Sequence, residues 1–466
     1  METTDFTSNY IHLITADMAH HYRIIPVFAD KDSISFHIED KNNNLDICEE
    51  LELILGKKIY LEPLTKADID KALSVNYRRE IGSKNLDVLA INHMDFLEDI
   101  LQEAKSLKSS DIHFEVYEKK SRVRFRIDGH LVERYKIEKD NYLELVNKIK
   151  IQAKLNITEK RLPQDGRITN GTFDIRVSVL PTLFGEKIVL RLLSQDASNL
   201  DLEDLGMDKK SKVLYTEAIQ KPNGLVLISG PTGSGKTTTL YASLRLLNDN
   251  KRNILTVEDP IEYTLKGINQ VQLKEDIGLS FSAALRSFLR QDPDIIMLGE
   301  IRDSETALMA IRASLTGHLV LSTIHTNSAL GTISRLLDMG IPSYLIAETL
   351  NISVAQRLLR CLCSHCKVEV PFEERNFPEN YKLPYIIEKY SIPIGCEKCY
   401  YTGYSGRKAI YEVIPQSNNL TRAIRSNNVA ENFNFTNHED LSIKAFNLLA
   451  QGVTSLEEIY PILINI

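Results

Sequence analysis

Hydrophobic residues in the second half of the chain form short runs, and segments with helical spacing separate these runs. The apolar runs predict strands at 225–228, 254–257, 295–298 and 319–324. Apolar positions three and four residues apart predict helices at 236–247, 304–314, 329–337 and 345–360. Strands that alternate with helices are typical of a parallel sheet with helices packed against it. We therefore predict an α/β domain over residues 205–466.

Polar and apolar residues alternate one by one in several stretches between residues 93 and 200. This alternation predicts strands at 111–116, 122–127, 167–169, 173–177 and 187–192, after a helix at 94–105. The hairpin turn signals are Asp128-Gly129 and Asn170-Gly171. Because side chains alternate across a strand, Arg122, Arg124 and Arg126 share one face. The pattern indicates an α+β domain whose arginine face is either a solvated surface or a functional one.

The first 92 residues carry a smaller pattern of mixed elements. Strands are predicted at 24–28 and 33–38, followed by a helix at 48–55 and a strand that begins at residue 60. The polar stretch 78–85 is a predicted linker. We expect a small α/β module over residues 1–92, ahead of the α+β domain at 93–200.

Composition and charge narrow the classes of function. The chain has 466 residues, and a single domain usually has about 100–200, so we expect more than one domain. Its 56 lysines and arginines against 63 acids give a net charge of −7, so no nucleic-acid partner is expected. No apolar run reaches the roughly 18–20 residues that span a bilayer, and the N-terminus lacks the features of a secretory signal. We expect a cytoplasmic protein.

A glycine-rich loop between a predicted strand and a predicted helix is the strongest functional signal. Residues 230–237 fit G-x4-G-K-[ST], in which glycines let successive backbone N–H groups point at phosphate oxygens. Lys236 would reach the β- and γ-phosphates, and the Thr237 hydroxyl would bind Mg2+. The expected ATP-binding residues are Gly230, Pro231, Thr232, Gly233, Ser234, Gly235, Lys236, Thr237 and Thr238.

Acidic residues follow the predicted strands at the edge of the sheet where this loop lies. Glu300 ends the run 294–300, and a carboxylate there would hold the Mg2+ shell or activate water. The acidic run 258–262 follows one strand, and His325 follows another at the same edge. The predicted chemistry is attack of water on the γ-phosphorus, and an arginine from a neighbouring subunit often completes such sites. The arginine-bearing strands before residue 200 supply candidates.

Clustered cysteines predict a structural zinc site. The two C-x2-C pairs are Cys363 with Cys366 and Cys396 with Cys399. Four thiolates suit a closed tetrahedral Zn2+ site, here within an insertion at 361–400. Cys361 lies close, but its C-x-C spacing to Cys363 is less suitable. The alternatives are reduced, unliganded cysteines and a nucleic-acid-binding zinc ribbon, and the absence of a nearby basic run disfavours the ribbon.

With these residues assembled, the sequence resembles the secretion-superfamily ATPases, in the branch that serves type II secretion and type IV pilus assembly. The resemblance covers nearly the whole chain from about Asp111 to Val453. The matching segments are GPTGSGKTT at 230–238, EDPIE at 258–262, LRQDPDIIMLGEIRD at 289–303, TGHLVLSTIHTNSA at 316–329, SDIHFE at 110–115, RLPQDGRI at 161–168 and GCEKCYYTGYSGR at 395–407. The resemblance implies a RecA-like P-loop domain, a PAS-like second N-terminal domain and a homohexamer.

The resemblance also implies roles for single residues. Glu262 would position the attacking water, Glu300 would be the Walker B acid, and His325 would sense the γ-phosphate. Arg167 and Arg176 fall in segments that supply arginines to the nucleotide site in that family, and Arg286 and Arg290 precede the predicted strand 295–298. The sequence leaves open which arginines act within a subunit and which act across subunits.

The implied function is a motor that hydrolyses ATP to ADP and phosphate to drive pseudopilus assembly in type II secretion. The alternative is a type IV pilus assembly ATPase. The cysteine pairs and the N-terminal module at 1–92 favour an assembly ATPase over a retraction ATPase. The shortness of this module favours the secretion branch. Because it has no RLGxxL-type motif, regulation by a cyclic dinucleotide is not expected. Expected partners are inner-membrane adaptor and platform proteins, bound through the N-terminal module, which would place the protein peripherally at that membrane.

Two other classes of protein fit the sequence less well. A nucleotide-gated scaffold has no need of the acids at 262 and 300, and a nucleic-acid translocase would need a basic channel that the composition does not support.

Overall fold

The computed structural model describes most of the chain. The described residues are 10, 13–14, 16–30, 32–40, 45–66, 68–69, 72–73, 77, 87–89, 96–170, 173–193, 201–372, 374–378, 381–426, 429 and 439–464. The predicted linker 78–85 and Gly171 of the second predicted turn lie outside them. Asn170 and Phe173 pair across antiparallel strands, so the chain reverses where that hairpin was predicted.

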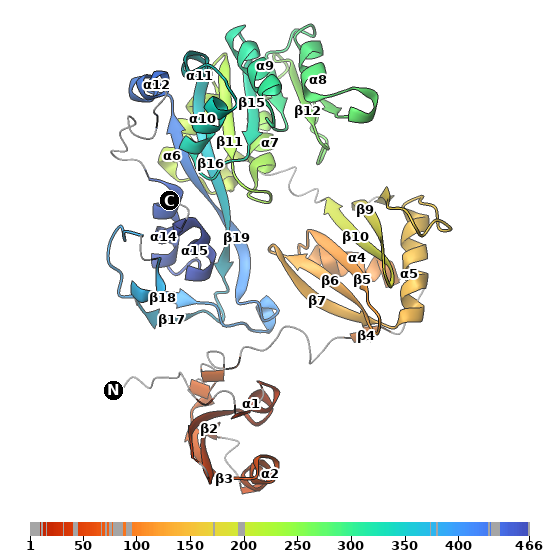
Figure 1. Ribbon diagram of the computed structural model, residues 1–466, viewed down its shortest axis with the longest axis vertical. Coiled ribbons are helices and arrows are strands. Elements are labelled where there is room, and N and C mark those ends of the chain that lie inside the picture. The colour runs from red at the N-terminus through yellow and green to blue at the C-terminus, as the bar shows by residue number, and fades with distance from the viewer. Residues whose placement is uncertain are drawn as a thin grey trace.

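A mostly parallel seven-stranded sheet forms the centre of the C-terminal half (Figure 1). Its order is β13 (Asn269–Gln272), β12 (Ile254–Glu258), β14 (Ile295–Leu298), β15 (Leu319–Ile324), β11 (Gly224–Ser229), β16 (Leu350–Leu362) and β19 (Tyr404–Pro415). Neighbouring strands from β13 to β16 are parallel, and β19 pairs antiparallel to β16. Strands β11, β12, β14 and β15 are buried at every position, as parallel strands covered on both faces should be. The predicted α/β sheet is confirmed.

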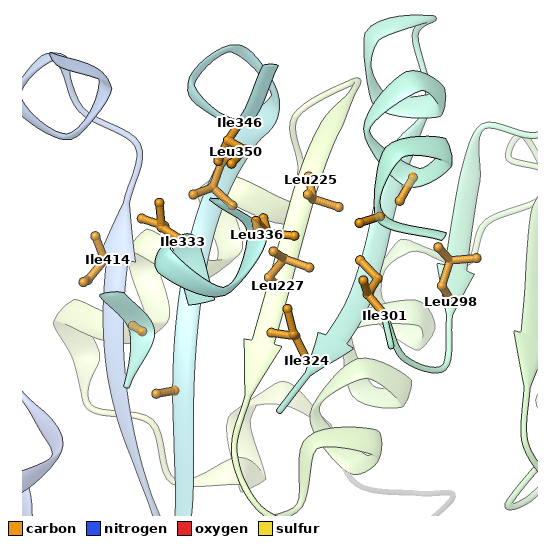
Figure 2. Close-up of a cluster of buried hydrophobic side chains, with 14 of the residues drawn as sticks. Leu225, Leu227, Leu298, Ile301, Ile324, Ile333, Leu336, Ile346, Leu350 and Ile414 are labelled. Carbon is orange, nitrogen blue, oxygen red and sulfur yellow. The ribbon is translucent and has the colours of Figure 1, made fainter. Parts of the chain in front are cut away.

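Helices cover both faces of this sheet. On one face pack α6 (Lys209–Ile219) and α7 (Lys236–Leu247). On the other pack α8 (Phe281–Phe288), α9 (Ser304–Leu315), α10 (Ala329–Asp338), α11 (Ser343–Thr349) and α12 (Asn418–Arg425). Figure 2 shows Leu225 and Leu227 of β11 beside Ile333 and Leu336 of α10 in this second core. Packing on both faces holds β11 firmly, and the glycine-rich loop leaves its carboxyl end.

The predicted helix at 345–360 is wrong. The chain forms α11 over Ser343–Thr349 and then strand β16 over Leu350–Leu362. This strand lies between β11 and β19 and is covered on both faces, so its apolar residues need not alternate with polar ones. Ile352 and Val354 are β-branched and pack in the core beneath α6 and α7. Burial on both faces therefore decides for a strand where the spacing alone suggests a helix.

Strands β16 and β19 run on from the sheet as a long antiparallel pair (Figure 1). Near their far end lie the paired strands β17 (Val368–Pro371) and β18 (Lys389–Ile392). Helices α14 (Leu441–Ala450) and α15 (Leu456–Leu463) pack against this region. The four paired cysteines lie in the same region, between β16 and β19 in the sequence.

A second seven-stranded sheet forms the middle of the chain. Its order is β4 (Asp87–Leu89), β7 (His130–Ile137), β6 (Ser121–Ile127), β5 (Asp111–Val116), β10 (Gly185–Leu193), β9 (Phe173–Thr182) and β8 (Gln164–Asn170). All pairs are antiparallel except β4 with β7. Helices α4 (Phe96–Ser106) and α5 (Lys139–Gln152) share a core with this sheet, and buried Lys150 of α5 pairs with Glu186 of β10 at 2.8 Å. This is the predicted α+β arrangement.

The N-terminal part is a small α/β unit. Strands β1 (Ile24–Ala29), β2 (Ser33–Glu39) and β3 (Lys58–Leu64) form a sheet in which β2 is antiparallel to β1 and parallel to β3. Helices α1 (Ala16–Tyr22) and α2 (Leu45–Leu55) accompany it, and all five elements share one core. Among the helices in the described ranges, none combines the length and apolar character that crossing a bilayer requires.

Candidate nucleotide and metal sites

Residues 230–235 connect β11 to α7, and glycines determine the shape of this loop. Gly233 and Gly235 have φ angles of +81° and +87°, in the left-handed region that glycine tolerates. A Cβ at Gly230 would lie 2.5 Å from the Gln356 carbonyl oxygen, and one at Gly235 would lie 2.8 Å from the Gln356 amide nitrogen. The loop therefore packs tightly against β16, and side chains at these two positions would push it away.

Lys236 begins α7 and reaches back to the loop. Its ammonium donates to the carbonyl oxygens of Gly230 at 2.8 Å and Pro231 at 3.0 Å. Burial lowers the pKa of Lys236, and the nearby charge of Glu300 opposes that shift. The Ser234 hydroxyl is buried and has no hydrogen-bond partner among the described residues. A cation and an unpaired polar group at a helix N-terminus fit a bound phosphate.

The rest of the loop is open to solvent. Pro231, Thr232 and Gly233 are exposed, as is Thr237 in the first turn of α7, and Thr238 is half-buried. Gly230, Ser234 and Lys236 are buried beneath this exposed rim, and Gly235 is half-buried.

Glu300 follows β14 and is the centre of a charged cluster. Its carboxylate accepts a hydrogen bond from Arg302 at 2.7 Å and lies 3.1 Å from His325 Nε2. Arg302 also lies 3.5 Å from Asp259, which follows β12. Strands β12, β14 and β15 are neighbours, so their carboxyl ends bring these side chains together. The structure joins Glu300 and His325, and β11, whose carboxyl end leads into the glycine-rich loop, is the parallel neighbour of β15, so the loop lies at the same edge of the sheet.

Glu262 lies on a different segment and contacts the middle sheet. Arg176 of β9 donates to the Ile261 carbonyl oxygen, and its guanidinium lies 3.6 Å from the Glu262 carboxylate. This contact joins the α+β part of the chain to the nucleotide region within one chain. Arg167 lies directly opposite Arg176 in the β8–β9 pair, but its guanidinium binds Asp174 instead. The two arginines therefore have different partners here.

The other candidate arginines have partners of their own. Arg286 of α8 pairs with Glu305 of α9, and Arg290 donates to the Arg286 carbonyl oxygen at 3.0 Å. In the middle sheet, Arg122 and Arg124 bind Glu115 at 2.9 and 2.7 Å. Burial would raise the pKa of Glu115, but hydrogen bonds from Arg124 and Arg122 hold it at about 2. These arginines are engaged away from Lys236 and Glu300 in this conformation.

Two polar residues at the site were not predicted from the sequence. Arg302 contacts Glu300 and Asp259, and its place two residues after a strand-end acid was the available signal. Tyr241 accepts a hydrogen bond from the Glu262 backbone N–H at 3.4 Å. Its place on α7 gave no indication of that contact, because the contact depends on how the 259–265 segment folds back.

The four sulfurs of the cysteine pairs lie as a tetrahedral metal site requires. Sulfur–sulfur distances are 3.9 Å for Cys363–Cys396, 3.7 Å for Cys366–Cys399 and 3.8 Å for Cys396–Cys399. Zn–S bonds of about 2.3 Å in a tetrahedron place sulfurs roughly 3.8 Å apart. All four atoms lie within 4.8 Å of one another, and all four cysteines are free thiols. The set fits a zinc ion.

Backbone groups support the same assignment. The N–H groups of Gly395 and Gly403 donate to the sulfurs of Cys366 and Cys399, each at 3.3 Å. Such donors stabilise metal-bound thiolates and orient them. Cys361 lies in β16 outside the cluster, as the C-x-C spacing suggested. The His365 ring is 3.4 Å from the Lys398 ammonium, so it has another partner.

The model of a family described as type II/IV secretion system protein matches residues 90–461. The chain belongs to this family. The family that the sequence suggested is therefore confirmed, and the protein is a secretion-family ATPase with a cysteine cluster that fits zinc.

Relatives of this secretion ATPase carry two kinds of name. The type IV pilus assembly ATPase PilB of Myxococcus xanthus is 40% identical and aligns with 98% of this chain and 87% of its own. The type II secretion system protein E of Pectobacterium carotovorum is 42% identical and aligns with 80% of this chain and 81% of its own. The general class, secretion or pilus ATPase, is common to both.

Solved structures of other ATPases are similar to this fold. The pilus retraction motor PilT with bound ADP is 27% identical, with a TM-score of 0.55 over 78% of this chain and 96% of its own. The ATPase DotB of Legionella pneumophila is 21% identical, with a TM-score of 0.57 over 82% of this chain and 100% of its own. The second likeness concerns the fold alone.

Proposed function

We propose that this ATPase is a hexameric motor that hydrolyses ATP to ADP and phosphate and drives pseudopilus assembly in type II protein secretion. The observation that carries the proposal is that the glycine-rich loop with Lys236 and the contacting pair Glu300 and His325 follow neighbouring parallel strands at one edge of the sheet, where Arg176 also contacts Glu262. A binding protein that only needed nucleotide as a structural element would have no use for two such carboxylates.

Each residue has a distinct role in this proposal. Lys236 and the loop N–H groups hold the β- and γ-phosphates, and Thr237 is the residue that would bind Mg2+. Glu300 is the Walker B acid, and His325, 3.1 Å from it, monitors the γ-phosphate. Glu262 positions water for in-line attack. The Mg2+ ion would supply neutralisation of charge on the phosphates when bound.

The arginines link hydrolysis to movement. Arg176 already contacts the Glu262 segment within the chain, so it is the arginine that we assign to this site in cis. Arg167, which is 61% exposed, is the one left for a neighbouring subunit. We assign residues 93–200 to a PAS-like domain and 205–466 to a RecA-like domain, with 361–400 as the zinc insertion. Opening and closing between them is the mechanical step.

A type IV pilus assembly ATPase is the alternative, and one observation favours it. The match to the pilus assembly ATPase of M. xanthus includes the front of the chain and covers 98% of it. In either case we propose that module 1–92 binds an inner-membrane adaptor or platform protein, and that the protein works in the cytoplasm at the membrane surface.

Complementation separates the two machines. In a deletion strain of the source bacterium, a Lys236→Ala chain should leave type II substrates inside the cell, because phosphate binding is lost, while surface pili persist. The matched control is Lys251→Ala, an exposed lysine after α7, which should restore secretion. Loss of pili with intact secretion would assign the protein to pilus assembly, and a Lys236→Ala chain that supports both would contradict the motor.

A further inference from the structure

A buried carboxylate lies behind the nucleotide site, in a part of the structure that the proposed function leaves unused. Glu258 ends β12 and is only 3% exposed. In the described part of the chain no lysine, arginine or histidine pairs with it. Its donors are instead the hydroxyls of Tyr241 and Thr256, the latter at 2.6 Å, and the amide of Gln270 at 3.1 Å. A buried acid held by three neutral donors orients those donors strictly.

Tyr241 is the member of this network that touches the catalytic segment. It lies on α7, five residues after Lys236, and its side chain is buried. Burial raises the pKa of Tyr241, so the hydroxyl stays protonated and donates a hydrogen bond to Glu258. The same oxygen accepts the Glu262 N–H at 3.4 Å.

The residue next to Glu262 is held by the same tyrosine. The rings of Tyr241 and Tyr263 meet edge to face, with centroids 4.5 Å apart and planes at 80°. Gln270, fixed by Glu258, also donates to the Tyr263 carbonyl oxygen at 3.2 Å. The segment around Glu262 thus rests on α7 through two contacts of Tyr241 and on β13 through Gln270.

From this geometry we propose that Tyr241 is a positioning residue for Glu262, with Glu258 as its anchor. The proposal rests on the proposed function, in which Glu262 positions the attacking water. Glu262 is 37% exposed on a segment without helix or strand, and its pairing with Arg176 at 3.6 Å ties it to the middle sheet and not to the helix that carries Lys236. Tyr241 ties that segment to the helix that carries Lys236, and this sets the distance between the water-positioning acid and the phosphate-binding lysine. A misplacement of about 1 Å between such groups costs about a hundredfold in rate.

The test is Tyr241→Phe, with Tyr215→Phe as its matched control. Tyr215 is also fully buried and hydrogen-bonds Ser243 of α7 at 2.8 Å, but among the described residues no hydrogen bond or ring contact joins it to the 259–265 segment. Each variant loses one buried tyrosine hydroxyl: that of Tyr241 extends from α7, and that of Tyr215 contacts α7 through Ser243. We expect Tyr241→Phe to lower kcat about tenfold with KM for ATP changed less than twofold, and Tyr215→Phe to leave both unchanged. Equal effects of the two variants on kcat would overturn the proposal.

Two further measurements distinguish positioning from general loosening. In a Glu262→Gln background, Tyr241→Phe should cause no further loss of kcat, because the tyrosine acts through Glu262; a second tenfold loss would count against it. Amide exchange of residues 259–265 should rise about tenfold in Tyr241→Phe and not in Tyr215→Phe. The exchange result does not depend on turnover. Unchanged exchange overturns the positioning role even if hydrolysis is normal, whereas a wild-type protein without hydrolysis would refute the proposed function.

Discussion

Glu300→Gln should bind ATP as tightly as the wild type and turn it over about a hundred to a thousand times more slowly. The amide is isosteric but neutral, so the charge beside His325 and Lys236 disappears while the loop that binds phosphates stays intact. Losing one preorganised electrostatic contact in an active site commonly costs two to three decades in kcat. Steady-state phosphate release and binding of a fluorescent ATP analogue measure the two quantities separately.

Glu305→Gln is the matched control for this prediction. Glu305 lies five residues later in α9, is 59% exposed and pairs with Arg286 at the surface, so its neutralisation should change turnover less than twofold. If Glu300→Gln kept more than half of the wild-type rate, the acid would have no part in hydrolysis. If it lost ATP binding instead, Glu300 would hold the ligand and not act on its reaction.

Removing two of the four clustered cysteines should destabilise the C-terminal region more than any single surface change. The variant is Cys396→Ser with Cys399→Ser, which deletes one of the two C-x2-C pairs. Structural zinc supplies about 10–16 kcal/mol of binding energy in small zinc domains, and part of it stabilises the fold. A loss of about 3 kcal/mol would lower the unfolding temperature of a domain of this size by about 6–12 °C.

Metal analysis and thermal unfolding check this prediction together. The wild type should contain one zinc per chain and the double variant none. Cys361→Ser is the control. Because Cys361 lies outside the cluster, this variant should keep both its zinc and its unfolding temperature. A wild-type protein that holds no zinc when purified without chelator, or a double variant that melts at the wild-type temperature, would refute a structural metal.

The fold could be predicted from the sequence where short apolar runs marked the strands of the parallel sheet. The short apolar runs at 225–228, 254–257, 295–298 and 319–324 all became parallel strands, because strands buried on both faces need continuous hydrophobic residues. Apolar spacing gave the wrong prediction at 345–360, where a helix was expected and the chain forms the buried strand β16. Spacing cannot separate a buried strand from a buried helix without knowledge of the neighbouring elements.

The site was predictable where chemistry and chain order coincide. The P-loop, Glu300 and His325 follow strands directly, so the parallel sheet alone places them at one edge. Arg176 and Arg167 lie on neighbouring strands and looked alike in the sequence, yet one contacts the Glu262 segment and the other binds Asp174. Which partner a long side chain takes depends on packing between parts of the chain, and local sequence does not encode it.

The most direct measurement is phosphate release by the purified full-length protein with Mg2+ and ATP, compared with Lys236→Ala. The account predicts turnover in the wild type that EDTA abolishes, and a loss of at least a hundredfold in the variant, because the loop without its ammonium cannot neutralise the β- and γ-phosphates. Wild-type protein that releases no phosphate, or a Lys236→Ala protein that releases it at the wild-type rate, would contradict the claim that this loop is the site of ATP hydrolysis.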